Sequence, residues 1–179
     1  MLAVPDQASE VELRLWERRL HCPSCGDGVL GPWGFARERQ LREADGALRQ
    51  LRPRRARCRA CQTTHVLVPT SMLVRRCDAV EVVGEALVAK AAGQSHRQIA
   101  AALARPASTV RGWLQRFNAR AEELRQIGTT LAHDFDPEMP AIVVRGSPFA
   151  DALEALGLAA AAAARRLGQA PLPGSSSRG

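Results

Sequence analysis

Residues 95–117, SHRQIAAALARPASTVRGWLQRF, predict two short helices separated by a tight turn. Ser95 and Gln98 form an S-x-x-Q capping box, which places the start of the first of these helices. Pro106 suits the first position of the second one, so the turn lies just before it. Apolar residues at helical spacing upstream add another helix, and together they predict a three-helix module over residues 78–126.

Apolar residues should form the buried side of this module. The residues expected to turn inward are Val80, Val83, Leu87 and Ala91 on the first helix and Val110, Trp113, Leu114 and Phe117 on the third. At 100° per residue, the opposite side of the third helix carries Ser108, Gly112 and Gln115, flanked by Arg111 and Arg116. A polar outer face with a central glycine predicts a helix-turn-helix whose third helix enters the major groove of DNA. A plain three-helix bundle with a solvated polar face is the alternative.

Two C-x-x-C pairs precede the helical module. Their four thiolates, from Cys22, Cys25, Cys58 and Cys61, can complete a tetrahedral Zn²⁺ site, and four protein ligands make such a site structural. Metal binding would contribute about 10–16 kcal/mol to the folding of this segment. The 32 residues between the pairs exceed the usual spacing of about 15–20, which a hairpin turning at Asp45-Gly46 would explain. A redox dithiol and a site without metal remain as alternatives.

Other residues near the cysteines have simpler interpretations. His21 and His65 flank the pairs; we interpret both as bystanders, with replacement of a cysteine ligand left open. Cys77 is expected to be a small buried side chain. Residues 26–31, GDGVLG, match a dinucleotide-binding pattern, but that pattern requires a strand before it and a helix after it. Here a metal-binding turn precedes it and Pro32 follows, so we reject that interpretation.

The charge of the chain favours a polyanionic partner. The formal net charge is +7 and the isoelectric point about 10.3, and 24 of the 25 basic residues are arginine. Residues 1–77 hold 14 basic and 8 acidic side chains, and residues 78–126 hold 7 and 5. Five of the arginines lie in the stretch RPRRARCRACQTTH (52–65) around the second cysteine pair. The arginines expected to contact phosphate without reading sequence are Arg54, Arg55, Arg57, Arg59 and Arg97.

These patterns predict an α+β protein: a small β-hairpin zinc ribbon, an all-α helix-turn-helix module and a C-terminal helix. The expected segments are a lead-in strand or short helix at 1–20, the ribbon at 21–77, the module at 78–126, a linker at 127–146, an Ala-rich helix at 147–168 and a disordered tail at 169–179. The last helix either docks on its own domain or pairs with a second chain, which leaves a homodimer open. The N-terminus lacks a signal-peptide pattern, and the longest apolar run, at 156–164, is too short to span a bilayer. We therefore expect a soluble, cytoplasmic, nucleoid-associated protein without a membrane partner.

The motifs resemble a known combination. QSHRQIAAALARPASTVRGWLQRF (94–117) resembles the homeodomain-like helix-turn-helix of insertion-sequence transposases and their resolvase-like relatives, and CPSC with RPRRARCRACQTTHVLVP resembles the zinc ribbon that precedes it. The combination, over about residues 20–125, is most similar to zinc-ribbon/helix-turn-helix proteins of high-GC bacteria. The resemblance implies that Ser108, Thr109, Arg111, Gly112 and Gln115 occupy DNA-reading positions and that the four paired cysteines bind zinc. The roughly 50 residues that follow the module have no room for the strand-transfer domain of a transposase.

Three classes of function follow from these observations. The first is a protein that binds double-stranded DNA, as a transcriptional regulator or a transposase-derived accessory. The second is an adaptor whose ribbon and helices bind another protein. The third, an enzyme or RNA-binding protein, is disfavoured because no Ser/His/Asp or open-metal arrangement is visible and no small-molecule substrate is evident. Aromatic residues, at 4%, are also too few for a single-strand reader.

Overall fold

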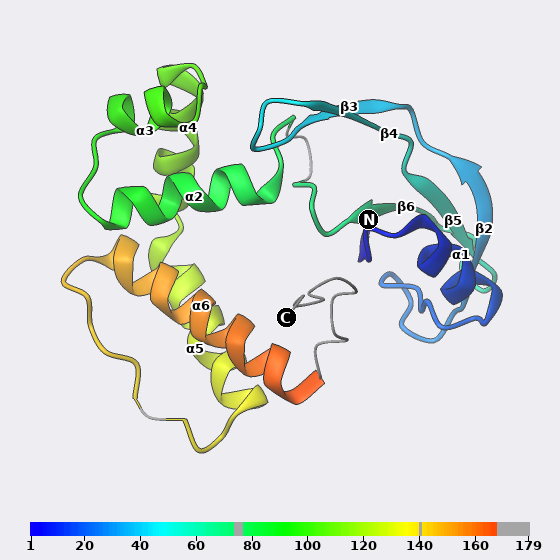
Figure 1. Ribbon diagram of the computed structural model, residues 1–179. Coiled ribbons are helices and arrows are strands. Elements are labelled where there is room, and N and C mark those ends of the chain that lie inside the picture. Colours follow the sequence, from blue (N-terminus) through cyan, green and yellow to red (C-terminus); the bar gives the residue numbers. More distant parts are fainter. Residues whose placement is uncertain (74–76, 140, 168–179) are drawn as a thin grey trace, which may run out of the picture. The chain divides into compact units, whose positions relative to one another are not determined.

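The computed structural model describes residues 1–73, 77–139 and 141–167, and its α+β composition confirms the predicted fold class (Figure 1). The chain forms two compact units, Met1–Glu85 (unit 1) and Ala86–Gly179 (unit 2), and each is described by itself. The predicted disordered tail at 169–179 lies outside the described residues. No helix in the described part of the chain is long and apolar enough to cross a membrane.

Unit 1 is built on a four-stranded sheet with the order β1-β6-β5-β2. The strands are β1 (Leu2–Val4), β2 (Leu30–Phe35), β5 (Arg54–Cys58) and β6 (Thr64–Pro69). β1 pairs with β6 in parallel, whereas the other pairs are antiparallel. The lead-in segment therefore supplies both a strand and a helix, α1 (Ala8–Trp16), which buries Val11 and Leu15 against the sheet.

The insert between the cysteine pairs forms a hairpin, as its length required. β3 (Arg39–Arg42) pairs with β4 (Leu48–Leu51), and the connection runs through Asp45-Gly46. Gly46 has a φ of 84°, a backbone conformation that glycine adopts without strain. The Asp45 carboxylate accepts a hydrogen bond from the Ala47 N–H at 2.9 Å, which closes the turn. The predicted position of the turn is confirmed.

Cys77 and the glycine-rich stretch are placed by neighbouring strands. Cys77 is exposed, so the prediction of a buried side chain was wrong. Its backbone carbonyl accepts a hydrogen bond from the Arg42 N–H at 2.6 Å, which ties the main chain to β3 while the side chain faces solvent. Residues 26–31 lead into β2 and not into a helix, in agreement with the rejection of a dinucleotide site.

The helical part of the chain begins with α2 (Val80–Ala91), α3 (His96–Ala102) and α4 (Ala107–Asn118). The capping box is present: Gln98 N–H donates to the Ser95 hydroxyl at 3.3 Å, and Ser95 N–H donates to Gln98 Oε1 at 2.9 Å. The buried face of the first helix is shifted by one position along the sequence from the predicted face. Its fully buried positions are Val82 and Ala86, and Ala79 is buried just before the helix, whereas Val80, Val83 and Leu87 are half-buried and Ala91 is exposed.

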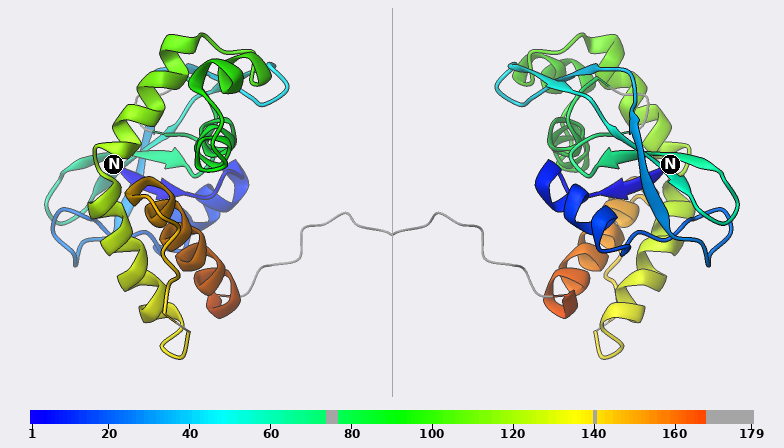
Figure 2. Two further views of the ribbon diagram at one scale, coloured as in Figure 1. Left: turned by 90° about the vertical axis from the view of Figure 1, so that its left-hand side faces the viewer. Right: turned by 90° about the vertical axis from the view of Figure 1, so that its right-hand side faces the viewer.

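The predicted linker starts later than expected, because a fifth helix, α5 (Ala121–Phe135), covers its first part. This helix lies along α6 (Pro148–Leu167) in unit 2, as the two views of Figure 2 show. The side chains that α6 buries are Phe149 and the alanines Ala152, Ala155, Ala159 and Ala162. A Cβ atom on Gly128 would lie 2.8 Å from the backbone carbon of Ala155, so small residues allow the two helices to approach closely. The C-terminal helix thus docks within its own chain.

Candidate metal centre and nucleic-acid interface

The sheet of unit 1 brings the two cysteine pairs together. Cys58 ends β5 and Cys61 lies in the turn to β6, while the first pair lies in the segment that leads into β2. The four Sγ atoms lie within 4.8 Å of one another. The Sγ atoms of Cys22 and Cys61 are 3.7 Å apart, as are those of Cys25 and Cys58. A tetrahedral Zn²⁺ with bonds of about 2.3 Å to sulfur separates its ligands by about 3.8 Å, so the spacing fits such an ion.

The backbone around the sulfurs is shaped for this cluster. The N–H groups of Ser24 and Cys61 donate to the sulfurs of Cys22 and Cys58, each at 3.4 Å. A Cβ atom on Gly28 would overlap Cys58 Sγ and lie 2.9 Å from Cys25 Sγ. Only glycine leaves room for the two sulfurs at this position. The glycine-rich stretch that imitates a nucleotide motif is therefore part of the cysteine site.

The pKa values of two of the cysteines are shifted in opposite directions. Hydrogen bonding with Thr63, whose hydroxyl lies 3.3 Å from the Cys61 sulfur, lowers the pKa of Cys61 to about 6. For Cys25, the backbone hydrogen bond at Gly28 lowers the pKa, but desolvation and the hydrogen bonds of the other cysteine sulfurs raise it to about 11 overall. Four thiolates this close repel one another, and a divalent cation bound between them would remove that penalty.

His65 contacts the cluster without joining it. Its side chain is 3% exposed, and its Nε2 atom lies 3.3 Å from Cys22 Sγ. Burial lowers the pKa of His65, which favours the neutral ring. A neutral ring protonated at Nε2 can donate a hydrogen bond to the Cys22 thiolate and so hold this ligand in place. The sequence pattern indicated a bystander at His65, although its position four residues after Cys61 was a signal for a contact with the cluster. His21 is exposed.

A tight turn joins α3 to α4. Ala104 has a φ of 49°, the left-handed conformation that reverses the chain after α3. Arg105 follows it, is 7% exposed, and donates from NH1 to the Leu103 carbonyl at 3.0 Å. That bond satisfies a carbonyl at the end of α3 that the helix leaves unpaired. The predicted position of the turn is confirmed.

The two faces of α4 differ as the sequence predicted. Val110, Trp113 and Leu114 are buried, and the ring of Phe117 contacts that of Phe149 with centroids 4.7 Å apart. The outer face presents the predicted polar set: Ser108, Arg111, Gln115 and Arg116 are exposed, while Thr109 and Gly112 are half-buried. The structure therefore places these six residues together on the outer face of α4.

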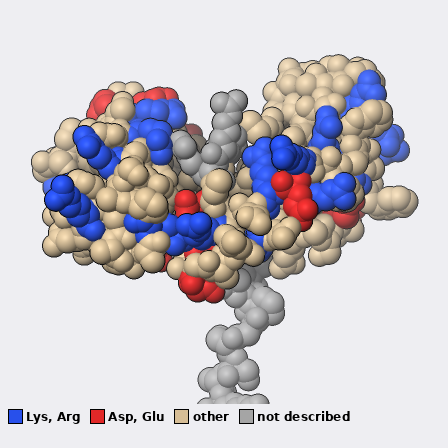
Figure 3. Space-filling view, turned by 90° about the horizontal axis from the view of Figure 1, so that it is seen from above, with Lys and Arg blue, Asp and Glu red and all other residues tan. Residues whose placement is uncertain are grey.

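The predicted phosphate contacts occupy different environments. Arg59 and Arg97 are exposed and Arg55 is half-buried. Arg54 has its Nε 2.7 Å from a Glu12 carboxylate oxygen, lies over the Phe35 ring and has a side chain only 18% exposed. These contacts give Arg54 a structural role in unit 1, and its contact with phosphate stays a prediction. Figure 3 shows basic side chains at the surface of both units.

Within the described residues, the four cysteines are the only group of His, Cys, Asp or Glu side chains placed to share a metal ion. A family of homeodomain-like domains matches residues 80–125, which covers α2, α3, α4 and the start of α5. The helical module is thus a homeodomain-like helix-turn-helix, a class of domain that binds DNA. No curated protein and no solved structure matches the chain.

Proposed function

We propose that this chain binds double-stranded DNA with the exposed face of α4 in the major groove, and that a structural Zn²⁺ holds unit 1 together. The observation that carries the proposal is the match of residues 80–125 to homeodomain-like domains together with the polar, basic outer face of α4. In such domains the helix after the turn supplies the side chains that meet base edges.

The chemistry of the α4 face supports base reading. Arg111 can donate two hydrogen bonds to a guanine, and Gln115 can pair with an adenine in the same way. Ser108, Thr109 and Arg116 surround them and can contact bases or neighbouring phosphates. At Gly112 an added Cβ would meet only the end of the Arg116 side chain, so the fold itself does not demand glycine there. A close approach of DNA to the α4 backbone accounts for it.

Zinc would be held by Cys22, Cys25, Cys58 and Cys61, and its charge would allow their thiolates to coexist. With four protein ligands the ion has no open position, so its role would be to stabilise unit 1 and not to activate a substrate. Arg55, Arg57, Arg59 and Arg97 would add phosphate contacts that carry no sequence information. Two biological forms fit this proposal, a transcriptional regulator and a transposase-derived accessory, both acting at the nucleoid. A homodimer would place two α4 helices on one duplex.

Fluorescence anisotropy of a labelled duplex, titrated with zinc-loaded protein at several salt concentrations, tests this proposal. Each phosphate that the protein neutralises should contribute about −0.9 to the slope of log affinity against log salt. We expect a steep negative slope. Failure to bind any duplex at low salt, by protein that circular dichroism shows to be folded, would contradict the proposal.

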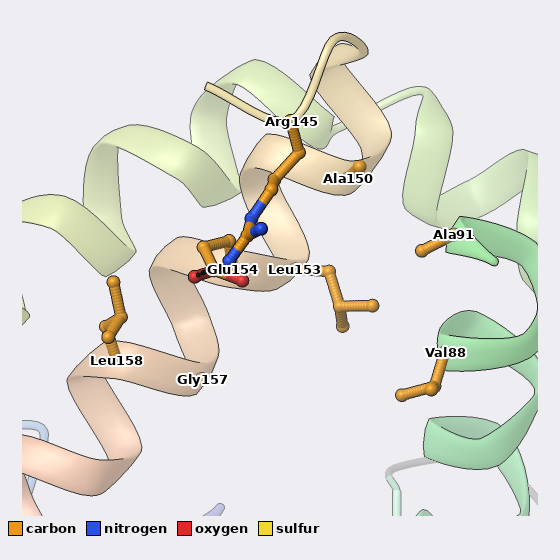
Figure 4. Close-up of a pocket in the computed structure, with 8 residues that line it drawn as sticks. All are labelled: Val88, Ala91, Arg145, Ala150, Leu153, Glu154, Gly157 and Leu158. Atoms are coloured by element: carbon orange, nitrogen blue, oxygen red, sulfur yellow. Dashed lines mark hydrogen bonds and ion pairs between the residues drawn. The ribbon is translucent and has the colours of Figure 1, made fainter. Parts of the chain in front are cut away.

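A cleft in unit 2 favours a second candidate function, that of a protein-binding adaptor. The cleft has a volume of about 510 Å³ and lies between α2 and α6 (Figure 4). Val88, which is 59% exposed, and Leu153 face it, and the ion pair of Arg145 with Glu154, 2.8 Å long, borders it. An exposed apolar wall with a charged rim suits a partner helix. An adaptor would show a flat salt dependence with duplex DNA, and Val88→Asp would abolish its partner binding.

A further inference from the structure

Unit 1 carries exposed aromatic side chains at its surface. The chain has only seven aromatic residues, and the three that the described structure exposes are all in unit 1: Trp16 at 86%, Trp33 at 50% and Phe35 at 49%. The aromatic residues of unit 2 serve its interior, as the burial of Trp113 and Phe149 shows. The low aromatic content of the chain disfavoured binding of single-stranded nucleic acid. The exposed aromatic side chains, however, are gathered in unit 1, where they can stack on bases.

Trp33 lies at an irregular point of the edge strand β2. The pairing of β2 with β5 shifts register between Pro32 and Phe35, and Gly34 there has a φ of 78°. Arg54 donates to the Gly34 carbonyl at 2.8 Å and so fixes this bulge. A bulge of this kind re-aims a side chain out of the regular pleat. Trp33 is thus held at the surface by the local backbone and not by chance flexibility.

Strand β5 and the residues just before it supply guanidinium groups to two of the exposed rings. The Arg57 guanidinium lies 4.6 Å from the centroid of the Trp33 ring, and its Nε donates to the Gln62 carbonyl at 3.1 Å. Phe35 has Arg52 and Arg54 at 5.2 and 4.6 Å from its ring centroid. Because the Gln62 contact uses only Nε, the two terminal nitrogens of Arg57 stay available to an anion.

A cleft adjoins Trp33 and is lined by aromatic, basic and small residues. Its volume is about 350 Å³, and it is lined by Gly31, Pro32, Trp33, Arg57, Cys58, Arg59 and Gln62. No acidic side chain is among them. Arg59 is exposed, and Gly31 contributes no side chain that would fill the space. An indole face beside two guanidinium groups can stack a base while it neutralises the adjoining phosphates.

We propose that this cleft, with Trp33, Arg57 and Arg59, is a second DNA site that binds an unpaired strand by stacking one of its bases on the Trp33 indole. A duplex does not offer the faces of its bases, because neighbouring base pairs cover them and only their edges reach the grooves. The site therefore requires a single-stranded end or segment. It goes beyond duplex binding by α4 and stands whether or not α4 binds a duplex.

The test measures the anisotropy of labelled oligothymidylate with full-length, zinc-loaded protein. Trp33→Ala should weaken this binding about 5- to 150-fold, the range of a lost stacking contact. Trp33→Phe should keep most of the affinity, because it keeps an aromatic face. Arg39→Ala is the charge-matched control for Arg57→Ala, since Arg39 is exposed in unit 1 but does not line the cleft. The control should lose much less affinity than Arg57→Ala does.

A duplex arm separates this proposal from that of α4. Trp33→Ala should leave duplex affinity unchanged, whereas Arg111→Ala should weaken the duplex and not oligothymidylate. If the protein bound oligothymidylate through Trp33 but did not bind a duplex, the proposed role of α4 would be refuted and the single-strand site would stand. The proposed single-strand site would be refuted if folded, zinc-loaded Trp33→Ala bound oligothymidylate as tightly as wild type. It would also be refuted if wild type did not bind oligothymidylate at low salt. If Trp33→Ala does not fold, wild type can be photocross-linked to an oligonucleotide that carries iododeoxyuridine. A cross-linked peptide that contains Trp33 would support the site, and a cross-linked peptide from another part of the chain would refute it.

Discussion

Replacing Gly112 by alanine tests why a glycine stands in the middle of α4. Glycine within a helix costs about 1 kcal/mol relative to alanine. The added Cβ would meet NH1 of Arg116 at 3.2 Å, which is the far end of a flexible side chain that can move aside. We therefore expect Gly112→Ala to raise the free energy of unfolding by about 0.5–1 kcal/mol. If the α4 backbone approaches DNA closely, the same methyl group should lower duplex affinity about fivefold or more, the equivalent of one lost base contact.

Gly128→Ala is the matched control, because it makes the same chemical change within helix α5. Here the added Cβ would lie 2.8 Å from the backbone carbon of Ala155 and 2.9 Å from the backbone nitrogen of Leu156. Backbone atoms cannot move aside unless the two helices separate. Overpacking of this kind costs about 1–3 kcal/mol. The gain in helix propensity offsets only part of this cost, so the variant should be less stable than wild type by up to about 2 kcal/mol.

Urea unfolding of the zinc-loaded proteins, followed by circular dichroism, and anisotropy with a labelled duplex together check both variants. We expect opposite changes in stability for the two glycine variants and a loss of duplex affinity for Gly112→Ala. A more stable Gly112→Ala that binds duplex DNA as tightly as wild type would refute the proposed approach of the α4 backbone to DNA. Equal stability changes in both variants would refute the packing argument.

Three further predictions concern other parts of the chain. Cys58→Ala, or removal of zinc by a chelator, should unfold unit 1 and leave the helical signal of unit 2 in circular dichroism. Cooperative loss of the structure of both units would contradict the inference that zinc stabilises unit 1 alone. Arg111→Ala should relax preference at one base pair at a cost of about 1–3 kcal/mol, whereas Arg55→Ala should weaken all duplexes alike and flatten the salt slope; identical behaviour in binding assays would refute this division. Hydrogen bonds from Arg125 lower the pKa of Glu122 to about 2, below the ordinary value of 4.5. The contribution of the Glu122 carboxylate to stability is therefore complete above about pH 4.5 and is lost as the pH falls toward 2. Glu122→Gln should therefore lose less stability than wild type between pH 5 and 2.5 in urea unfolding, and an equal loss would show that the pair contributes nothing.

Local signals predicted much of the fold and of the candidate site. The capping residues Ser95 and Gln98 and the breaker Pro106 act within a few positions, so the helix starts followed from the sequence. The C-x-x-C spacing predicted that four cysteines would converge although 32 residues separate the pairs, because a metal site needs only the two turns to meet. The hairpin turn at Asp45-Gly46 was equally local.

What the sequence did not predict depends on contacts between distant segments. Gly128 and its threonine neighbours are poor helix formers, but α5 continues through them because α6 packs against it with a row of alanines. The parallel pairing of β1 with β6 joins segments more than 60 residues apart, and no local pattern announces it. The exposure of Trp33 and the contact of His65 with Cys22 likewise depend on strands that meet only in the folded protein.

Selection from a random pool of duplexes by zinc-loaded protein, with sequencing of the bound DNA at several salt concentrations, tests the central claim most directly. The claim that α4 reads bases predicts an enriched motif, with an affinity that falls steeply as salt increases. Binding without an enriched motif would contradict base reading by α4, and the absence of binding at low salt would contradict duplex binding by α4.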